Sequence, residues 1–190
     1  MKIRNTIGLA SASLIAASAT AQVNFDGTSA YTEDFDGLAI SSGSHTFVDN
    51  STIAGVTVNS EEMDSNDDEY YASTGASNGG EVYSFGDSSS TERALGYVGS
   101  GGNDYINIFV SLNNTSGGTI DSLSISYDGE LWRSGGTTSD NQNYFKFSYA
   151  IGIDPLPATT STAGWTEVSA LDYILTAGQQ ILSTGAKDGN

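Results

Sequence analysis

The chain has no cysteine, a single histidine and only six lysine and arginine residues among its 190 residues. Without cysteine, neither a disulfide framework nor a thiolate metal site can form. With so few basic side chains, the chain lacks the clustered lysines and arginines that bind the phosphate backbones of nucleic acids. We therefore expect a fold stabilised by burial of apolar side chains, and no nucleic-acid partner.

Negative charge dominates the rest of the composition. The chain has 23 aspartate and glutamate residues, and two of its six basic residues, Lys2 and Arg4, lie at the very start. The remainder carries four basic against 23 acidic residues, a net charge of −19. Such a charge disfavours binding to anionic membrane surfaces. It suits solubility, salty surroundings or bound divalent cations.

The first 21 residues have the three parts of a secretory signal peptide. A basic start at Lys2 and Arg4 precedes an apolar run and a cleavage site of small residues at 19–21. The apolar run is shorter than the roughly 20 residues that a membrane-spanning helix needs. We expect residues 1–21 to be removed and 22–190 to form one domain. The protein is then secreted or at the bacterial cell surface, with no membrane insertion after cleavage.

Apolar residues recur at every second position in short segments, with Gly, Ser, Asn and Asp between them. The alternation is strongest over residues 106–112, 122–128 and 145–151. Weaker alternation predicts further strands at 31–35, 46–48, 56–59, 70–73, 81–85, 94–98 and 165–168. One-sided alternation is typical of antiparallel sheets that pack face to face. The sequence therefore predicts an all-β, antiparallel two-sheet sandwich.

Five segments occur in an order that is more specific than any one of them. They are Glu33-Asp34-Phe35-Asp36, Tyr70-Tyr71-Ala72-Ser73, Tyr83-Ser84-Phe85-Gly86, residues 90–96 and residues 126–133. The set resembles a secreted bacterial β-sandwich module found in proteins with PEP-CTERM sorting tails and beside extracellular hydrolase domains. The resemblance implies a jelly-roll-like sandwich and no established activity. Members usually continue past a segment like 188–190, so it also implies that the C-terminal strands are missing here.

The densest group of oxygen ligands is an acidic loop. Its candidate metal ligands are Asp64, Asn66, Asp67, Asp68 and Glu69. Hard cations such as Ca²⁺ prefer several oxygen ligands at once, so the loop is a candidate calcium site. It does not fit the EF-hand pattern, because glutamate stands where the turn glycine belongs and glycine where the closing glutamate belongs. A solvated acidic loop without an ion is the other interpretation.

A second candidate site combines aromatic rings with charged side chains. Its candidate ligand-binding residues are Glu130, Trp132, Arg133, Tyr70 and Tyr71. An exposed tryptophan beside a carboxylate suits sugar binding, because rings pack on pyranose faces while charged groups bind the hydroxyls. In the structural interpretation, Trp132 caps the core and Arg133 pairs with Glu92 or Glu130.

No catalytic arrangement is recognisable in the sequence. His45 is the only histidine, and no Gly-x-Ser-x-Gly motif accompanies it. Acidic residues are plentiful enough for a two-carboxylate glycosidase, but no paired motif supports one. We expect a non-catalytic module that binds a polysaccharide or cell-surface glycan. The alternatives are a structural envelope or matrix module without a small-molecule ligand, and an accessory domain of an extracellular hydrolase.

Overall fold

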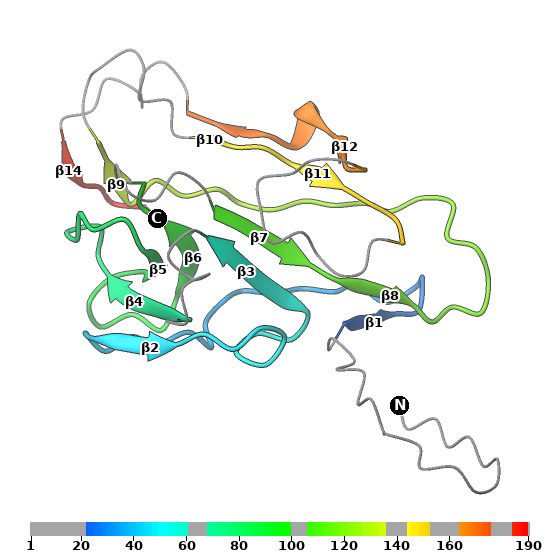
Figure 1. Cartoon of the computed structure of the whole chain (residues 1–190), viewed down its shortest axis with the longest axis horizontal. Coiled ribbons are helices and arrows are strands. Elements are labelled where there is room, and N and C mark those ends of the chain that lie inside the picture. Colours follow the sequence, from blue (N-terminus) through cyan, green and yellow to red (C-terminus); the bar gives the residue numbers. More distant parts are fainter. Residues whose placement is uncertain are drawn as a thin grey trace, which may run out of the picture.

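The computed structural model describes residues 22–60, 68–99, 106–135, 144–152, 164–175 and 184–189. Within these ranges the chain is all-β, and a single 3-10 turn, η2 (Ser169–Leu171), is the one helical element (Figure 1). The prediction of an all-β fold is confirmed. None of the helical structure in these ranges is long and apolar enough to cross a membrane. The jelly-roll arrangement stays a prediction.

The largest sheet has four strands. Their order is β2 (Ser44–Thr46), β4 (Glu69–Ser73), β5 (Val82–Phe85) and β6 (Ala94–Tyr97). β2 and β6 are antiparallel to their neighbours, but β4 and β5 are parallel, with Tyr71 opposite Tyr83. The predicted antiparallel pairing holds for most strand pairs, and the β4–β5 pair departs from it. Parallel pairing suits β5, whose four residues are all buried, because parallel strands occur where both faces are covered.

The other strands form two-stranded pairs, which Figure 1 shows above and to the right of the four-stranded sheet. β3 (Val56–Ser60) and β7 (Ile106–Val110) are antiparallel, whereas β1 (Val23–Phe25) and β8 (Leu112–Asn114) are parallel. The short antiparallel pairs are β9 (Arg133–Ser134) with β14 (Gly185–Ala186), β10 (Tyr144–Phe145) with β13 (Tyr173–Ile174), and β11 (Ser148–Tyr149) with β12 (Thr166–Glu167).

Two apolar clusters lie on opposite faces of β5. The first consists of Leu38, Phe47, Ile53, Val56, Val58, Tyr70 and Val82, with Ile106 and Ile108 of β7 packed against it. The second consists of Tyr83, Phe85 and Trp132. Because side chains alternate along a strand, Val82 points into the first cluster and its neighbour Tyr83 into the second. The first cluster fills the space between the four-stranded sheet and the β3–β7 pair, which gives a sandwich-like arrangement.

A buried arginine joins β5 to the start of β6. Arg93 is 2% exposed, and its Nε donates to Ser84 Oγ at 2.7 Å. Its guanidinium also donates to the carbonyl oxygens of Ser84 and Asp87, and its backbone N–H donates to Asp36 Oδ1 at 3.1 Å. Burial lowers the pKa of Arg93, while the charges of nearby acidic groups oppose that shift. Arg93 is therefore held mainly by the Ser84 hydroxyl and by backbone carbonyl oxygens.

Residues 122–128 do not form the strand that their alternation predicts. The segment 119–132 belongs to no sheet, and Figure 1 shows it as an extended yellow-green trace between β7 and β10. Leu123 and Ile125 are 47% and 41% exposed, so they cover no core. Tyr127 packs on Phe147 with ring centroids 6.3 Å apart, and its hydroxyl donates to the carbonyl oxygen of Leu171.

Residues 31–35 also form no strand, and the cause is local. Phe35 has a φ of 61°, and its backbone N–H donates a hydrogen bond to Glu33 Oε1 at 2.9 Å. A positive φ at an aromatic residue breaks an extended conformation. The backbone turns here instead, so that Leu38 N donates to the carbonyl oxygen of Phe35 at 2.9 Å. This turn delivers Leu38 to the first cluster.

Candidate functional site

A hollow of about 330 Å³ opens to solvent where β4 and β5 meet the approach to β2. Its lining consists of Ser42, Gly43, Tyr71, Ala72, Ser77, Glu81 and Tyr83. We call it the tyrosine groove. The lining combines two aromatic rings, two serine hydroxyls and one carboxylate, while its remaining members are small residues that leave room for a ligand.

The parallel pairing of β4 with β5 creates the aromatic part of the groove. Tyr71 and Tyr83 are direct partners in the register, so their side chains leave the sheet on the same face. Their ring centroids lie 6.3 Å apart at an angle of 50°. Tyr83 is 3% exposed and Tyr71 is half-buried. Tyr83 therefore forms the floor of the groove, and Tyr71 forms a wall.

Hydrogen bonds fix both tyrosine rings. The Tyr71 hydroxyl donates to Glu69 Oε2 at 3.1 Å, and Glu69 Oε1 accepts a second hydrogen bond from Ser44 Oγ at 2.6 Å. The Tyr83 hydroxyl donates to the carbonyl oxygen of Gly79 at 3.2 Å. Rings held in this way lose little freedom when a ligand packs on them, which favours binding.

Arg133 holds the loop that brings Ser77 to the groove. Its Nη1 donates to the carbonyl oxygens of Gly75 and Ala76, at 2.9 Å and 3.1 Å. Gly75 has a φ of +80°, and a Cβ there would lie 1.8 Å from the carbonyl oxygen of Trp132. Only glycine fits this close approach. Arg133 thus binds backbone carbonyls where a carboxylate of Glu92 or Glu130 was expected.

The electrostatic field in the groove is negative. Burial raises the pKa of Tyr71, and the hydrogen bond to Glu69 and the charges of Glu69 and Glu81 raise it further. Burial and then the charge of Glu81 raise the pKa of Tyr83, whereas a hydrogen bond with Ser77 and the charge of Arg133 lower it by less. Both tyrosines are therefore neutral donors beside carboxylate charge.

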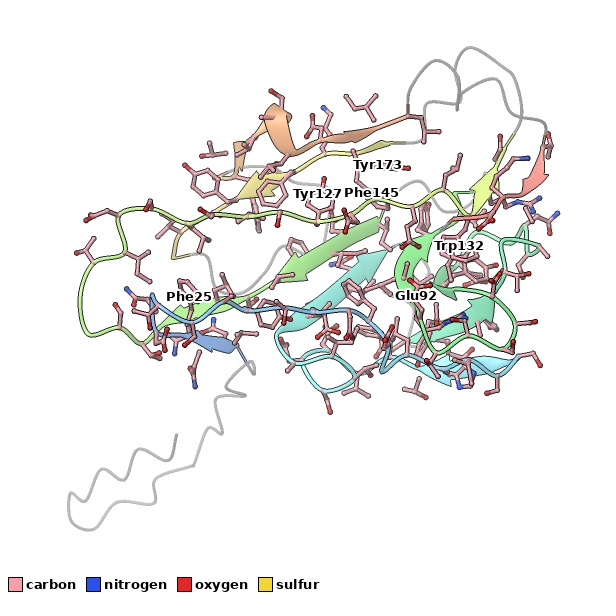
Figure 2. All side chains as sticks on the ribbon, turned by 180° about the vertical axis from the view of Figure 1, so that it is seen from behind. Phe25, Glu92, Tyr127, Trp132, Phe145 and Tyr173 are labelled. Atoms are coloured by element: carbon pink, nitrogen blue, oxygen red, sulfur yellow. The ribbon has the colours of Figure 1, made fainter. Side chains whose placement is uncertain are left out.

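Trp132 and Glu130 are placed together, but in the core. Trp132 is 4% exposed, and its ring stacks on Phe85 at 6.3 Å with an angle of 6°. Its Nε1 donates to Glu130 Oε2 at 2.6 Å. Figure 2 shows Trp132 among the side chains around the four-stranded sheet. The structure thus agrees with the interpretation in which Trp132 caps the core, and its ring offers no open face to a sugar.

Tyr70 and Tyr71 are neighbours in sequence, but their side chains lie on opposite faces of β4. Tyr70 is 5% exposed, its ring meets Phe47 edge-on, and its hydroxyl oxygen accepts a hydrogen bond from Ala39 N at 3.1 Å. It belongs to the first cluster. Of the five candidate ligand-binding residues, Tyr71 is the one that lines the groove. Arg133 acts behind it through the loop.

Sequence reasoning missed Glu81, Tyr83, Ser42 and Ser77 as site residues. Tyr83 and Tyr71 do share one signal, because each stands in a short Tyr-containing strand segment. Nothing local in the sequence says that the two segments pair in parallel with Tyr71 opposite Tyr83. That register is what brings the residues together.

Three of the candidate calcium ligands, Asp64, Asn66 and Asp67, lie outside the described residues. Asp68 is exposed, and its carbonyl oxygen accepts from Phe47 N at 2.6 Å. Both carboxylate oxygens of Glu69 accept hydrogen bonds in the wall of the groove. In the part of the chain that the structure covers, no three histidine, aspartate or glutamate side chains lie close enough to hold an ion. A calcium site in this loop stays a prediction.

His45 does not activate Ser41, the serine beside its Nε2 atom, as a nucleophile. Its Nε2 lies 2.8 Å from the carbonyl oxygen of Ser41 and 3.5 Å from Ser41 Oγ. A carbonyl oxygen can only accept, so the proton resides on Nε2. In that tautomer Nε2 cannot take the proton of the serine hydroxyl. The ring packs beside Tyr70, with centroids 5.5 Å apart.

Comparison of the chain with protein families, with curated proteins and with solved structures gave no match. The resemblance to modules of PEP-CTERM-type proteins therefore remains a prediction from the sequence motifs.

Proposed function

We propose that the chain is an exported, non-catalytic module that binds carbohydrate in the tyrosine groove. The observation that carries this proposal is the lining, in which two fixed tyrosine rings stand beside serine hydroxyls and a carboxylate. The half-buried ring of Tyr71 can pack on the apolar face of a sugar, while Tyr83, 3% exposed, supports it from the floor of the groove. The polar groups of the lining bind sugar hydroxyls. The volume of about 330 Å³ is at the lower end of the range for small-ligand pockets. It suits a short stretch of a polysaccharide or a cell-surface glycan.

The sequence supports the exported location. A basic start, an apolar run and a small-residue cleavage site stand in the order of a secretory leader over residues 1–21. The lack of cysteine and the large negative charge are compatible with a secreted or surface-held bacterial module. A glycan-binding site on such a module would hold the protein, or a partner domain, on a glycan.

The test is retention on immobilised polysaccharides and a glycan array. We expect Tyr71→Ala to lose retention, because it removes the wall of the groove, whereas Tyr149→Ala on β11, 45% exposed, keeps it. Since Tyr71 also packs against the second cluster, Ser42→Trp provides a second variant that fills the groove from an exposed position. Equal retention of the wild type and both groove variants would refute the groove as the binding site.

The alternative is a structural envelope or matrix module without a small-molecule ligand. It makes the opposite prediction in the same experiment, since no glycan would retain the wild-type chain. An accessory domain of an extracellular hydrolase would give the same retention as the binding module. In that case, addition of the chain to a hydrolase that acts on the retained glycan would raise the hydrolysis rate.

A further inference from the structure

The tyrosine groove carries negative charge on two sides. Glu81 is part of the lining, and Glu69 lies directly behind the Tyr71 hydroxyl, 3.1 Å away. The directions of the pKa shifts of Tyr71 and Tyr83 agree with this placement, since the charge of Glu81 raises both. A ligand that enters the groove therefore meets carboxylates at close range.

The arginines near the groove donate hydrogen bonds to oxygens of Ser84, Asp87, Gly75 and Ala76. Arg93 is bound on the other face of β5, because its guanidinium binds Ser84 while Tyr83 faces the groove. Arg133 donates to the carbonyl oxygens of Gly75 and Ala76. Its charge reaches Tyr83 but has a smaller influence than that of Glu81.

We infer that the tyrosine groove selects a cationic saccharide, namely a glycan with free, protonated amino groups. The inference rests on the proposed carbohydrate function and names the class of sugar. An ammonium group can donate charge-assisted hydrogen bonds to Glu81, which are about twice as strong as neutral ones. The half-buried ring of Tyr71 attracts cations as well. Ser42 and Ser77 supply hydroxyls for the remaining sugar hydroxyl groups.

Acidic glycans are disfavoured for the same reason. A uronate or sulfate group would stand beside Glu81 and near Glu69, and like charges at short range repel. The overall charge of −17 adds to this repulsion at low ionic strength. N-acetylated sugars keep the ring shape but lack the positive charge, which makes them the sharpest comparison.

The test uses titration calorimetry of the full chain with three oligosaccharides of equal length, at mildly acidic pH. They consist of glucosamine, N-acetylglucosamine and galacturonic acid. A hydrogen bond to a charged group corresponds to about a tenfold gain in affinity or more. We therefore expect the glucosamine oligomer to bind at least about tenfold more tightly than the N-acetylated one. We expect no binding of the galacturonic acid oligomer.

Two variants separate a specific site from general attraction to an acidic protein. Glu81→Gln should remove most of the preference for the amine, because it weakens binding of the glucosamine oligomer far more than binding of the N-acetylated one. Glu167→Gln, on β12, removes the same charge from an exposed position and should change neither. Equal losses with both variants would overturn the inference, because the amine would then respond only to net charge.

The remaining outcomes distinguish this inference from the function on which it rests. Equal affinity for the glucosamine and N-acetylated oligomers, with Tyr71→Ala abolishing both, would refute the cationic preference and keep the carbohydrate site. Failure of all three oligomers and of the glycan array would refute both. Tighter binding of a trilysine peptide than of the glucosamine oligomer would also overturn the inference, because the groove would then recognise lysine.

Discussion

The buried side chains of Arg93 and Ser84 are linked by a short, specific hydrogen bond. Arg93 binds Ser84, and Ser84 in turn donates to the carbonyl oxygen of Ala39 at 2.9 Å. Because Ser84 is 0% exposed, its hydroxyl has no access to water. A buried hydroxyl without a partner costs about 1–3 kcal/mol. Replacing Arg93 or Ser84 alone would therefore leave a buried polar group of the other without its hydrogen-bond partner.

Glu92 gives a residue-scale prediction about pH. Burial raises its pKa above the ordinary value of 4.5, and the charges of Glu130 and Asp36 raise it further, while Arg93 opposes them. The folded state therefore holds this proton more tightly than the unfolded state does, and stability is lost as the pH rises through the folded-state pKa. We expect Glu92→Gln to be more stable than the wild type at neutral pH. We expect the advantage to shrink as the pH falls towards 4.5.

Urea unfolding at a series of pH values measures this difference. Removing any carboxylate from so acidic a chain reduces general repulsion, so Glu167→Gln serves as the matched control. Only Glu92→Gln should flatten the pH dependence just above the ordinary pKa of a glutamate. Identical curves for the two variants would mean that Glu92 feels no special environment.

At the scale of elements, the strand content followed from alternation, but the pairing did not. The strands predicted at 56–59, 70–73, 81–85 and 94–98 are found as β3, β4, β5 and β6. Each of these segments places apolar side chains into a core, which is the property that alternation reports. The parallel register of β4 with β5 depends on contacts between distant segments, which local patterns do not encode. Tyr71 could therefore be predicted as a site residue, whereas its partner Tyr83 could not.

The segment 122–128 shows the limit of the same signal. Serine alternating with Leu123, Ile125 and Tyr127 gives the pattern of a half-buried strand, yet these three side chains are more than 40% exposed. Alternation describes an extended backbone and does not say whether a core exists on the apolar side. For this reason the alternation predicted a half-buried strand where the apolar side chains are in fact exposed.

A matched pair of leucines tests the status of this segment. Leu38 is 3% exposed in the first cluster, and Leu123 is 47% exposed in the segment 119–132. We expect Leu38→Ala to lower the free energy of unfolding by about 2–5 kcal/mol. We expect Leu123→Ala to change it by less than about 0.5 kcal/mol. Urea unfolding provides both values, and a comparable loss at Leu123 would show that the segment packs in a sheet after all.

At the scale of the whole molecule, β5 couples the two apolar clusters. Val82 belongs to the first and Tyr83 and Phe85 to the second, so neither cluster can lose β5 without disturbing the other. Figure 2 shows a separate aromatic group at the β10–β13 pair, where Tyr127, Phe145 and Tyr173 are labelled. None of these three residues belongs to either cluster, so their side chains pack separately from β5.

This coupling predicts a single unfolding transition for the two clusters. The chain has two tryptophans, so Trp165→Phe leaves Trp132 as the only one, and its fluorescence then reports on the second cluster. Far-UV circular dichroism reports on the sheets as a whole. We expect the two signals to give the same midpoint in urea. A Trp132 transition at lower urea would show that the second cluster unfolds by itself.

The parallel pairing of β1 with β8 also limits how early in biosynthesis these two strands can pair. Roughly 90 residues separate Phe25 from its partner Asn114. At a translation rate of about 5–20 residues per second, the ribosome needs roughly 4–18 s to produce β8 after β1. Until then this ladder cannot close, so β1 stays unpaired with β8 and available to chaperones during synthesis.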